Sequence, residues 1–312
     1  MKKRAGFEKF MSTEKKGAAK KEHFKQEKRK FKKELTEKFQ AKKRAAQGPP
    51  SSGTNGKTPT GRPSILKKAD TSSMPLNKYI AHCGLCSRRD AVELVKGGKV
   101  RVNNEIISEP GFKIAPNDSV TVSGKKITPV IELVYILINK PKDYITTTDD
   151  PQQRKTVLDI IKHATTERIY PVGRLDRNTS GVLLMTNDGD LSQMLTHPSN
   201  EIRKIYAVTL DRPLAKKDFD EILKGVPLED GIAKVDVLAY TDAQDKKQIG
   251  VELHSGRNRI VRRIFEHFKY DVKGLDRVSF AGLTKKNVNR GKWRYLNEKE
   301  VRDLKFFKKG KK

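Results

Sequence analysis

The chain of 312 residues carries 67 Lys and Arg against 38 Asp and Glu, which gives it a formal net charge of +29. Such a charge attracts polyanions and makes their binding depend on salt, so the composition favours nucleic acid as the partner. The apolar runs are far shorter than the roughly 18 residues of a membrane span, and no apolar segment follows the basic N-terminus as in a secretory signal. We therefore expect a cytoplasmic protein that does not enter a membrane.

The first 73 residues differ in composition from the remainder of the chain. They hold 22 Lys and Arg against 7 Asp and Glu, contain few aliphatic side chains, and end in a stretch rich in Pro, Gly, Ser and Thr. Such a segment buries too little apolar surface to offset the entropy lost on ordering. We therefore expect residues 1–73 to form a disordered basic tail, and residues 305–312 to form a short basic tail at the other end.

Residues 74–128 are typical of two short helices followed by short strands. Ser87 and Asp90 have the spacing of a helix N-cap and its capping box, which predicts that the second helix begins beside Ser87. The pair Asn103 and Asn104 lies between apolar runs and suits a hairpin turn. Four basic residues on and just after the second helix fit either a phosphate-binding surface or a solvated helix face: Arg88, Arg89, Lys96 and Lys99.

Potential metal ligands in the same segment are His82, Cys83 and Cys86. A structural zinc site needs four ligands, and the other histidines lie at no usual ligand spacing from these three. We expect no metal site, and we interpret the two cysteines as packed side chains.

Residues 132–304 are long enough for a domain with a core of its own. Because its strands and helices do not alternate regularly, the order favours an α+β domain with an open, mostly antiparallel sheet and flanking helices. Strands are predicted at 133–138, 205–210, 233–238 and 249–253, and helices at 216–224 and 257–268.

Residues 171–181 read PVGRLDRNTSG and place a single carboxylate between two guanidinium groups. Glycines on either side permit a sharp turn or a close approach of the backbone to a ligand. Arg174 and Arg177 should stabilise the charged form of Asp176, which leaves a carboxylate able to act as a nucleophile or a base. A structural ion pair in a basic loop is the alternative interpretation.

Two later segments carry further candidate site residues. Tyr206 follows Lys204 at the start of a predicted strand, where a tyrosine serves either a site or ordinary packing. Residues 256–265, GRNRIVRRIF, put apolar side chains on one helical face and arginines on the others. The arginines fit a polyanion, a buried acid or an exposed basic surface: Arg257, Arg259, Arg262 and Arg263.

Taken together, these segments resemble the motifs of the pseudouridine synthases that modify ribosomal RNA, in the branch called the RsuA/RluB type. The resemblance rests on residues 173–181, on NKPKD at residues 139–143, and on the segments that contain Tyr206 and Arg262. It implies the pseudouridine synthase fold for residues 132–304. Residues 74–128 resemble the small alpha-L RNA-binding domain of a ribosomal small-subunit protein, whose basic residues contact phosphates.

The resemblance also implies roles for individual residues. Asp176 and Tyr206 would be catalytic, with Tyr206 beneath the target base. Arg262 would be the third catalytic residue and pair with Asp176, although Arg263 lies close enough to leave that assignment open. The residues that would bind RNA are Arg174, Arg88, Arg89, Lys96, Lys99, Arg257, Arg259 and Arg263.

The implied reaction breaks the glycosidic bond of a uridine in RNA, rotates the uracil and reattaches it through carbon 5. It needs no redox change, group donor or metal, so we expect no cofactor. Asp176 would attack the sugar or act as a base after the nucleotide has flipped into a pocket.

Residues 195–201 and 225–231 look most like the subgroup that modifies large-subunit ribosomal RNA. The expected partner is therefore ribosomal RNA or a pre-ribosomal particle, bound by a monomer. Two alternatives stay open: the same chemistry on small-subunit ribosomal RNA or transfer RNA, and a ribosome-assembly factor that binds ribosomal RNA without catalysis.

Overall fold

The computed structural model describes residues 74–130 and 132–306. The basic tail expected at residues 1–73 lies outside the described residues, as do residue 131 and residues 307–312. Within the two described ranges, no helix is long and apolar enough to cross a membrane.

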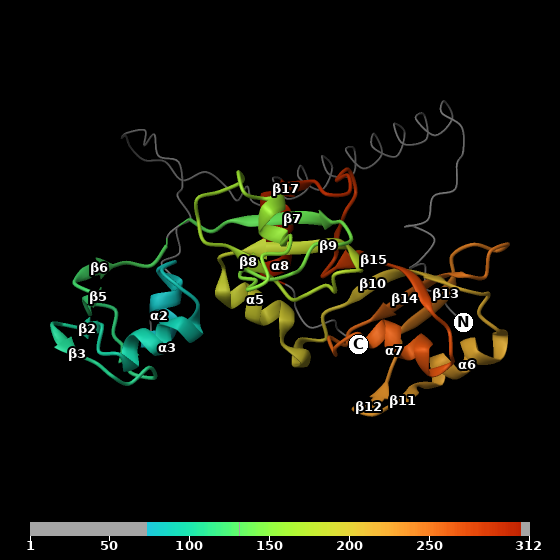
Figure 1. Ribbon diagram of the computed structural model, residues 1–312, viewed down its shortest axis with the longest axis horizontal. Coiled ribbons are helices and arrows are strands. Elements are labelled where there is room, and N and C mark those ends of the chain that lie inside the picture. The colour runs from blue at the N-terminus through green and yellow to red at the C-terminus, as the bar shows by residue number, and fades with distance from the viewer. Residues whose placement is uncertain (1–73, 131, 307–312) are drawn as a thin grey trace, which may run out of the picture. The chain divides into compact units, whose positions relative to one another are not determined.

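Residues 74–127 form a small unit of two helices and short strands (Figure 1). Helices α2 (Leu76–His82) and α3 (Arg88–Lys96) share one core with an antiparallel sheet in the strand order β3, β2, β5, β6. Two further strands, β1 and β4, pair beside this sheet. The strands are β1 (Met74–Pro75), β2 (Val100–Val102), β3 (Glu105–Ile106), β4 (Lys113–Ile114), β5 (Val120–Val122) and β6 (Lys125–Ile127).

Local signals in this unit act as the sequence predicts. The Ser87 hydroxyl accepts from the Asp90 N–H at 3.2 Å, and the Asp90 carboxylate accepts from the Ser87 N–H at 3.1 Å. Asn103 and Asn104 take the left-handed φ angles 51° and 71° of a tight turn between β2 and β3. Both predictions are confirmed. Burial raises the pKa of the Cys83 thiol to about 12, in agreement with a packed side chain.

The larger unit is built on a nine-stranded sheet whose main path runs β13, β14, β10, β15, β9, β7, β17. Strand β16 adds to β15, and β8 adds to β9. The strands are β7 (Tyr135–Lys140), β8 (Tyr170–Pro171), β9 (Ser180–Thr186), β10 (Lys204–Leu210), β13 (Val237–Tyr240), β14 (Gln248–Leu253), β15 (Val272–Phe280), β16 (Leu283–Thr284) and β17 (Trp293–Tyr295). Among the strand pairs of the described residues only β9 with β15 is parallel, so the mostly antiparallel α+β fold is confirmed.

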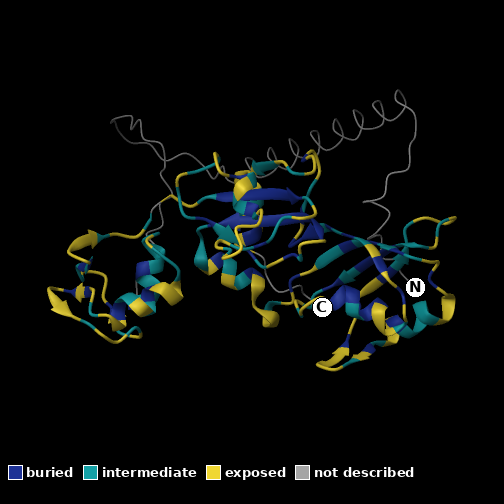
Figure 2. Cartoon of the chain, viewed as in Figure 1, coloured by how far each residue is buried: buried dark blue, intermediate teal, exposed yellow. Residues whose placement is uncertain are grey.

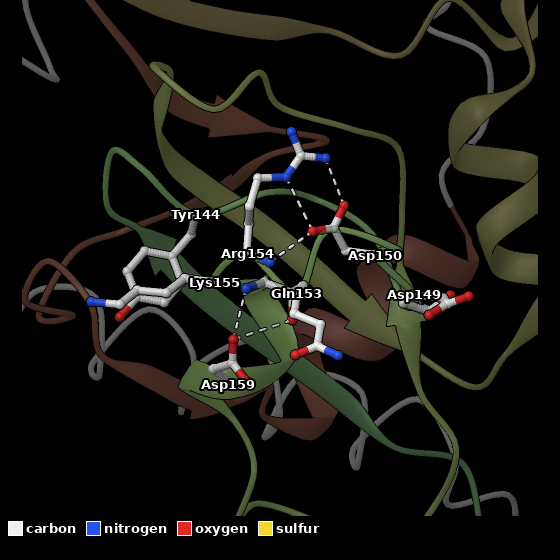
Figure 3. A pocket seen from close by; sticks show the side chains of 9 residues that line it. Tyr144, Asp149, Asp150, Gln153, Arg154, Lys155 and Asp159 are labelled. Carbon is white, nitrogen blue, oxygen red and sulfur yellow. Dashed lines mark hydrogen bonds and ion pairs between the residues drawn. The ribbon is translucent and has the colours of Figure 1, made fainter.

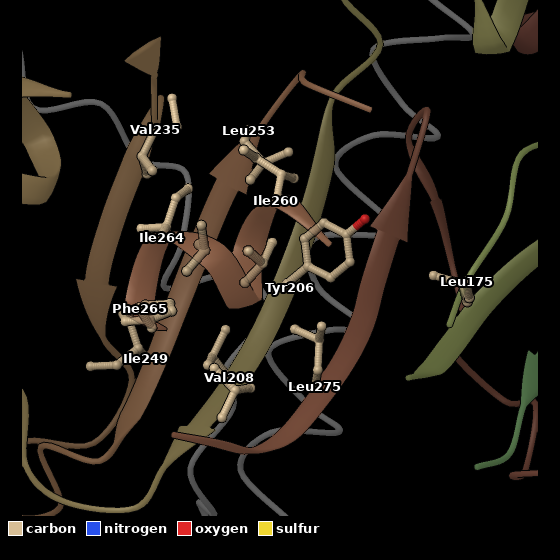
Figure 4. Close-up of a cluster of buried hydrophobic side chains, with 14 of the residues drawn as sticks. Leu175, Tyr206, Val208, Val235, Ile249, Leu253, Ile260, Ile264, Phe265 and Leu275 are labelled. Carbon is tan, nitrogen blue, oxygen red and sulfur yellow. The ribbon is translucent and has the colours of Figure 1, made fainter. Parts of the chain in front are cut away.

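Helices cover both faces of this sheet, and its central strands are buried (Figure 2). On one face, α7 (Ile260–His267) packs on β10, β14 and β15 (Figure 4). The short helix α4 (Val157–Ile160) and α6 (Lys216–Lys224) contribute side chains to the same core. On the other face, α5 (Gly189–Thr196) and α8 (Glu298–Lys305) pack on β7 and β9. All seven residues of β9 are buried because it is covered on both sides, which explains its unbroken apolar run. A 3-10 turn (Pro198–Asn200) precedes β10.

The parallel joint between β9 and β15 depends on Gly181. Gly181 is the Cα partner of Arg277 and has a φ of 111°, a conformation that L residues rarely adopt. A Cβ atom at this position would lie 2.2 Å from the Arg277 carbonyl oxygen. Only glycine therefore allows β9 to pair with β15, and this pairing brings the end of the 173–179 loop next to β15.

Three predicted elements differ from the structure. The strand expected at 233–238 is wrong, because β12 (Gly231–Ala233) forms a separate hairpin with β11 (Val226–Leu228), while β13 pairs with β14. The helix expected at 257–268 begins only at Ile260, because Arg259 takes a left-handed φ of 48°. The first strand begins two residues later than position 133, since Leu133 is exposed.

Candidate active site

The PVGRLDRNTSG segment forms the loop between β8 and β9. A turn closes inside it, where the Thr179 N–H donates to the Asp176 carbonyl oxygen at 3.0 Å. The half-buried Asp176 lines a cavity of about 670 Å³, together with Arg174 and Tyr206. A cavity of this size lies within the range that binds small molecules or single nucleotide units.

Lys140 binds the backbone of this loop. The sequence did not indicate Lys140 as a site residue. Its side chain is fully buried at the end of β7. The ammonium group donates to the carbonyl oxygens of Pro141 (3.1 Å), Asp176 (3.1 Å), Arg177 (3.2 Å) and Thr179 (2.7 Å). Burial lowers the pKa of Lys140 to about 8, against an opposing effect of Asp176. Lys140 therefore fixes the backbone that carries Asp176.

Thr146 supports the same loop from a second direction. Its hydroxyl donates to the Leu175 carbonyl oxygen at 2.8 Å and accepts from the Leu175 N–H at 3.3 Å. Both residues are buried. The backbone on the N-terminal side of Asp176 is therefore fixed as well.

The two arginines that flank Asp176 in sequence do not pair with it. Arg177 lies 3.3 Å from the carboxylate of Asp143, because the 143 and 177 backbones run side by side and share a hydrogen bond. Arg174 is exposed at the cavity wall. Within the described ranges, no Lys or Arg nitrogen lies within 4.0 Å of the Asp176 carboxylate. The alternative interpretation of a structural ion pair between Asp176 and either flanking arginine is therefore wrong, and the expected stabilisation of the Asp176 carboxylate by these arginines stays a prediction.

Arg262 and Arg263 point in different directions on α7, which separates the two assignments. Arg262 is 9% exposed and donates to the carbonyl oxygens of Val272 (2.8 Å) and Asn178 (3.4 Å). Burial lowers its pKa, and the nearby Asp176 opposes this shift. The expected ion pair with Asp176 is thus replaced by a bond to the backbone of its loop.

Arg263 and Arg257 bind the β11–β12 hairpin. Arg263 donates to both carboxylate oxygens of Asp230, at 2.7 and 2.9 Å. Arg257 donates to the same carboxylate at 3.0 Å and to the carbonyl oxygens of Asp230, Gly231 and Ile232 at 2.9 Å. Part of each guanidinium group is therefore engaged within the protein, and the expected contact of Arg257 and Arg263 with RNA stays a prediction.

The remaining predicted RNA-binding residues are exposed. Arg259 lines the cavity and pairs with Glu266 at 3.0 Å. On the small unit, Arg88 and Arg89 are exposed at the N-terminal end of α3, Lys96 at its C-terminal end and Lys99 just after it.

Tyr206 lies in the cavity floor, on β10. It is 8% exposed, and its ring packs beside Ile260 and Leu275 (Figure 4). All three residues also line the cavity. One face of the tyrosine is thus in the core, and the floor that it forms is apolar.

A second cavity, of about 550 Å³, lies against the 144–159 loop (Figure 3). Its wall includes the ion pair of Arg154 and Asp150, whose nitrogen and oxygen lie 2.6 Å apart. Hydrogen bonds from Arg154 hold the pKa of the Asp150 carboxyl below its usual range. Both residues also line the cavity of Asp176, so this pair shapes the wall between the two cavities.

Comparison with known proteins defines the class first. A family model described as RNA pseudouridylate synthase matches residues 134–267, and a model of the S4 domain matches residues 74–129. The chain is therefore an RNA-modifying enzyme with an S4 domain before its catalytic part.

Individual relatives then give the family. "Ribosomal large subunit pseudouridine synthase B" of Bacillus subtilis (strain 168) is 40% identical over 232 residues, which cover 73% of this chain and 94% of that protein. "Dual-specificity RNA pseudouridine synthase RluF" of Escherichia coli (strain K12) is 34% identical over 239 residues, 75% and 79% of the two chains. A solved structure titled "Crystal structure of pseudouridylate synthase" superposes with a TM-score of 0.53 at 25% identity, over 74% of this chain and 100% of that one. The chain belongs to the RNA pseudouridine synthase family, and the resemblance drawn from its motifs is confirmed.

Proposed function

We propose that this enzyme converts a specific uridine of large-subunit ribosomal RNA to pseudouridine, with Asp176 as its catalytic carboxylate. The observation that carries the proposal is Asp176 itself. It lines a nucleotide-sized cavity above an apolar floor, on a loop that Lys140 holds through three of its carbonyl groups. The name of the Bacillus subtilis relative supports the large-subunit target.

In this proposal the target uridine leaves the RNA helix and enters the cavity. Flipping costs a few kcal/mol, which stacking and phosphate contacts offset. Tyr206 offers the ring face on which uracil lies. The glycosidic bond from nitrogen 1 breaks, uracil rotates, and carbon 5 bonds to the sugar, while carbon 5 loses a proton and nitrogen 1 gains one.

Asp176 either attacks the anomeric carbon or removes a proton from the neighbouring sugar carbon. Arg262 acts as a positioning residue, because it binds the Asn178 carbonyl and not the carboxylate. Lys140 has the same function on the other side of the loop. Neither role requires a cofactor.

The division of labour along the chain is also part of the proposal. Residues 74–128 and their basic residues Arg88, Arg89, Lys96 and Lys99 position the RNA, and residues 132–304 catalyse. The tails 1–73 and 305–312 add sequence-independent attraction to phosphates. The enzyme works as a cytoplasmic monomer on ribosomal RNA or a pre-ribosomal particle.

A second candidate is a target outside the large subunit. The Escherichia coli relative is named a dual-specificity enzyme, so one protein of this kind acts on more than one site. Small-subunit ribosomal RNA and transfer RNA are the alternatives. A purely structural role in ribosome assembly is less favoured, because it leaves the buried support of Asp176 without a purpose.

Mapping of pseudouridines in all stable RNAs tests the proposal, in cells with and without the gene. Loss of one large-subunit pseudouridine, restored by the wild-type gene and not by Asp176→Asn, is the expected result. If the missing pseudouridine lay in transfer RNA or small-subunit RNA instead, the second candidate function would replace the first. An unchanged map would contradict the proposed catalytic activity.

A further inference from the structure

Arg277 is a buried arginine in the cavity wall that the catalytic account does not use. It lies on β15 with 2% of its surface exposed. Its Nε donates to the Val182 carbonyl oxygen at 2.8 Å, and its guanidinium lies over the Phe280 ring at 4.6 Å. The Nη2 group is buried and has no well-formed hydrogen bond within the described residues, although the side chain of Tyr206, the Cα partner of Arg277 on β10, lies near enough to oppose the lowering of the Arg277 pKa by burial. A buried cationic donor therefore remains unsatisfied where the cavity is lined.

Lys204 lies next to Arg277 on the neighbouring strand β10. Its Cα partner on β15 is Phe280, the residue on which the Arg277 guanidinium stacks. The ammonium group donates to the carbonyl oxygens of Ile202 (2.9 Å) and His254 (2.6 Å), which uses two of its three protons. Burial lowers the pKa of Lys204 to about 8, and Arg277 acts in the same direction. Both Lys204 and Arg277 line the cavity, and these two residues are called the cation pair below.

No carboxylate of the described residues forms an ion pair with either member of the cation pair. Asp236, the acid that acts on Lys204, lies 2.9 Å from the His254 ring nitrogen. Asp276 binds Lys285 and Arg290. The cations whose pKa values Asp176 acts to raise are Lys140 and Arg262. Lys204 and Arg277 thus lie in the cavity lining without a carboxylate partner among the described residues, whereas Asp176 acts on Lys140 and Arg262.

Arg277 is buried and Lys204 is half-buried, and two such like charges without a counter-charge are costly. A bound anion lowers that cost. The anion that an RNA substrate brings into a cavity is its own backbone phosphodiester. Lys204 and Tyr206 lie on the same face of β10, about 7 Å apart along the strand. This span is comparable with that from a base to the phosphate of its own nucleotide, so a base on Tyr206 brings a phosphate to Lys204.

We propose that Lys204 and Arg277 form a subsite for a phosphodiester group next to the flipped uridine. The inference rests on the proposed function, since it assumes a uridine stacked on Tyr206. A phosphate between the two cations fixes the rotation of the sugar relative to Asp176. It also accepts hydrogen bonds from the free Lys204 proton and from Arg277.

A substrate series with single uncharged phosphates tests this subsite. Synthetic RNA that contains the mapped uridine is made with one methylphosphonate at each position next to it in turn. At one position, wild-type enzyme should lose at least tenfold in kcat/KM. Lys204→Met should lose a similar factor on unmodified RNA and almost nothing further on the methylphosphonate at that position. Lys204→Arg, which keeps the charge, should remain sensitive to the substitution.

Additive losses in Lys204→Met and the methylphosphonate would overturn the subsite, as would a wild-type enzyme indifferent to every position. Exposed Lys142→Met is the matched control and should behave as wild type. Arg277→Met, which removes the second charge, should shift the sensitivity in the same direction as Lys204→Met. If wild-type enzyme turned over no RNA, the proposed function would fail instead, so the two failures are distinguishable.

Discussion

The ammonium group of Lys140 lies 2.7 Å from the carbonyl oxygen of Thr179, 39 positions further along the chain. The same ammonium group also donates to the carbonyl oxygens of Asp176 and Arg177, so Lys140 restrains a loop that is bounded by glycines. A catalytic carboxylate needs such fixation, because a displacement of about 1 Å lowers rates about a hundredfold.

Replacement of Lys140 by methionine should therefore remove the support of the loop. The variant leaves buried carbonyl groups without a donor, each at a cost of about 1–3 kcal/mol. We expect a loss of at least about 2 kcal/mol in the free energy of unfolding and a severe loss of kcat. Urea denaturation and turnover check this, with exposed Lys142→Met as the control. A stable and active Lys140→Met protein would contradict the role.

Stability should depend on pH through Lys204, which is half-buried. The folded-state pKa of Lys204 is about 8, below its ordinary 10.5, so the unfolded chain binds more protons between these values. The contribution of Lys204 to the free energy of unfolding therefore rises with pH in this window and is constant below it. When both proteins are denatured with urea, the free energy of unfolding of wild type should rise relative to that of Lys204→Met between about pH 8 and about pH 10.5. A flat difference would show that the ammonium group is not buried.

Arg262 and Arg263 should respond very differently to replacement by alanine. Arg262→Ala leaves the carbonyl groups of Val272 and Asn178 without this donor, and we expect a loss of about 1–3 kcal/mol for each in stability or transition-state binding. Arg263 pairs with the partly exposed Asp230, so Arg263→Ala should lower turnover only slightly. Parallel measurement of unfolding and kcat/KM distinguishes them, and equal losses would mean that the helix register is misread.

Gly181→Ala should prevent the β9–β15 joint from forming. A Cβ there meets the Arg277 carbonyl oxygen at 2.2 Å, on a backbone with φ of 111°. We expect a loss of more than about 4 kcal/mol in stability, or failure to fold. Gly282→Ala is a control with a φ of 81° and open space around the new atom, and should cost about 1 kcal/mol. Similar losses for the two variants would mean that the close approach is unimportant.

The sequence predicted those features that depend on neighbours along the chain. The capping box of Ser87 and Asp90, the turn at Asn103 and the loop of Asp176 are all local patterns, and they appear where expected. Lys140 did not stand out because a lysine that follows an apolar strand usually marks its exposed end. Its role depends on carbonyl groups almost forty positions away.

Arg277 was missed for a similar reason. Strand β15 mixes charged and apolar residues, so its sequence did not distinguish Arg277 from an arginine on an exposed segment. The burial of Arg277 follows from Val182, which is 95 positions away in sequence. The ion pairs of Arg257 and Arg263 were not predicted either, because their partner Asp230 lies on a hairpin that the sequence did not predict.

The most direct test of the account is the activity of Asp176→Asn on ribosomal RNA labelled with tritium at carbon 5 of uridine. Asparagine has the shape of aspartate but neither attacks carbon nor accepts a proton comparably, and the backbone bonds of Lys140 to this loop stay in place. The account predicts no tritium release above background, with RNA affinity within a few-fold of wild type. Tritium release near the wild-type rate would contradict it.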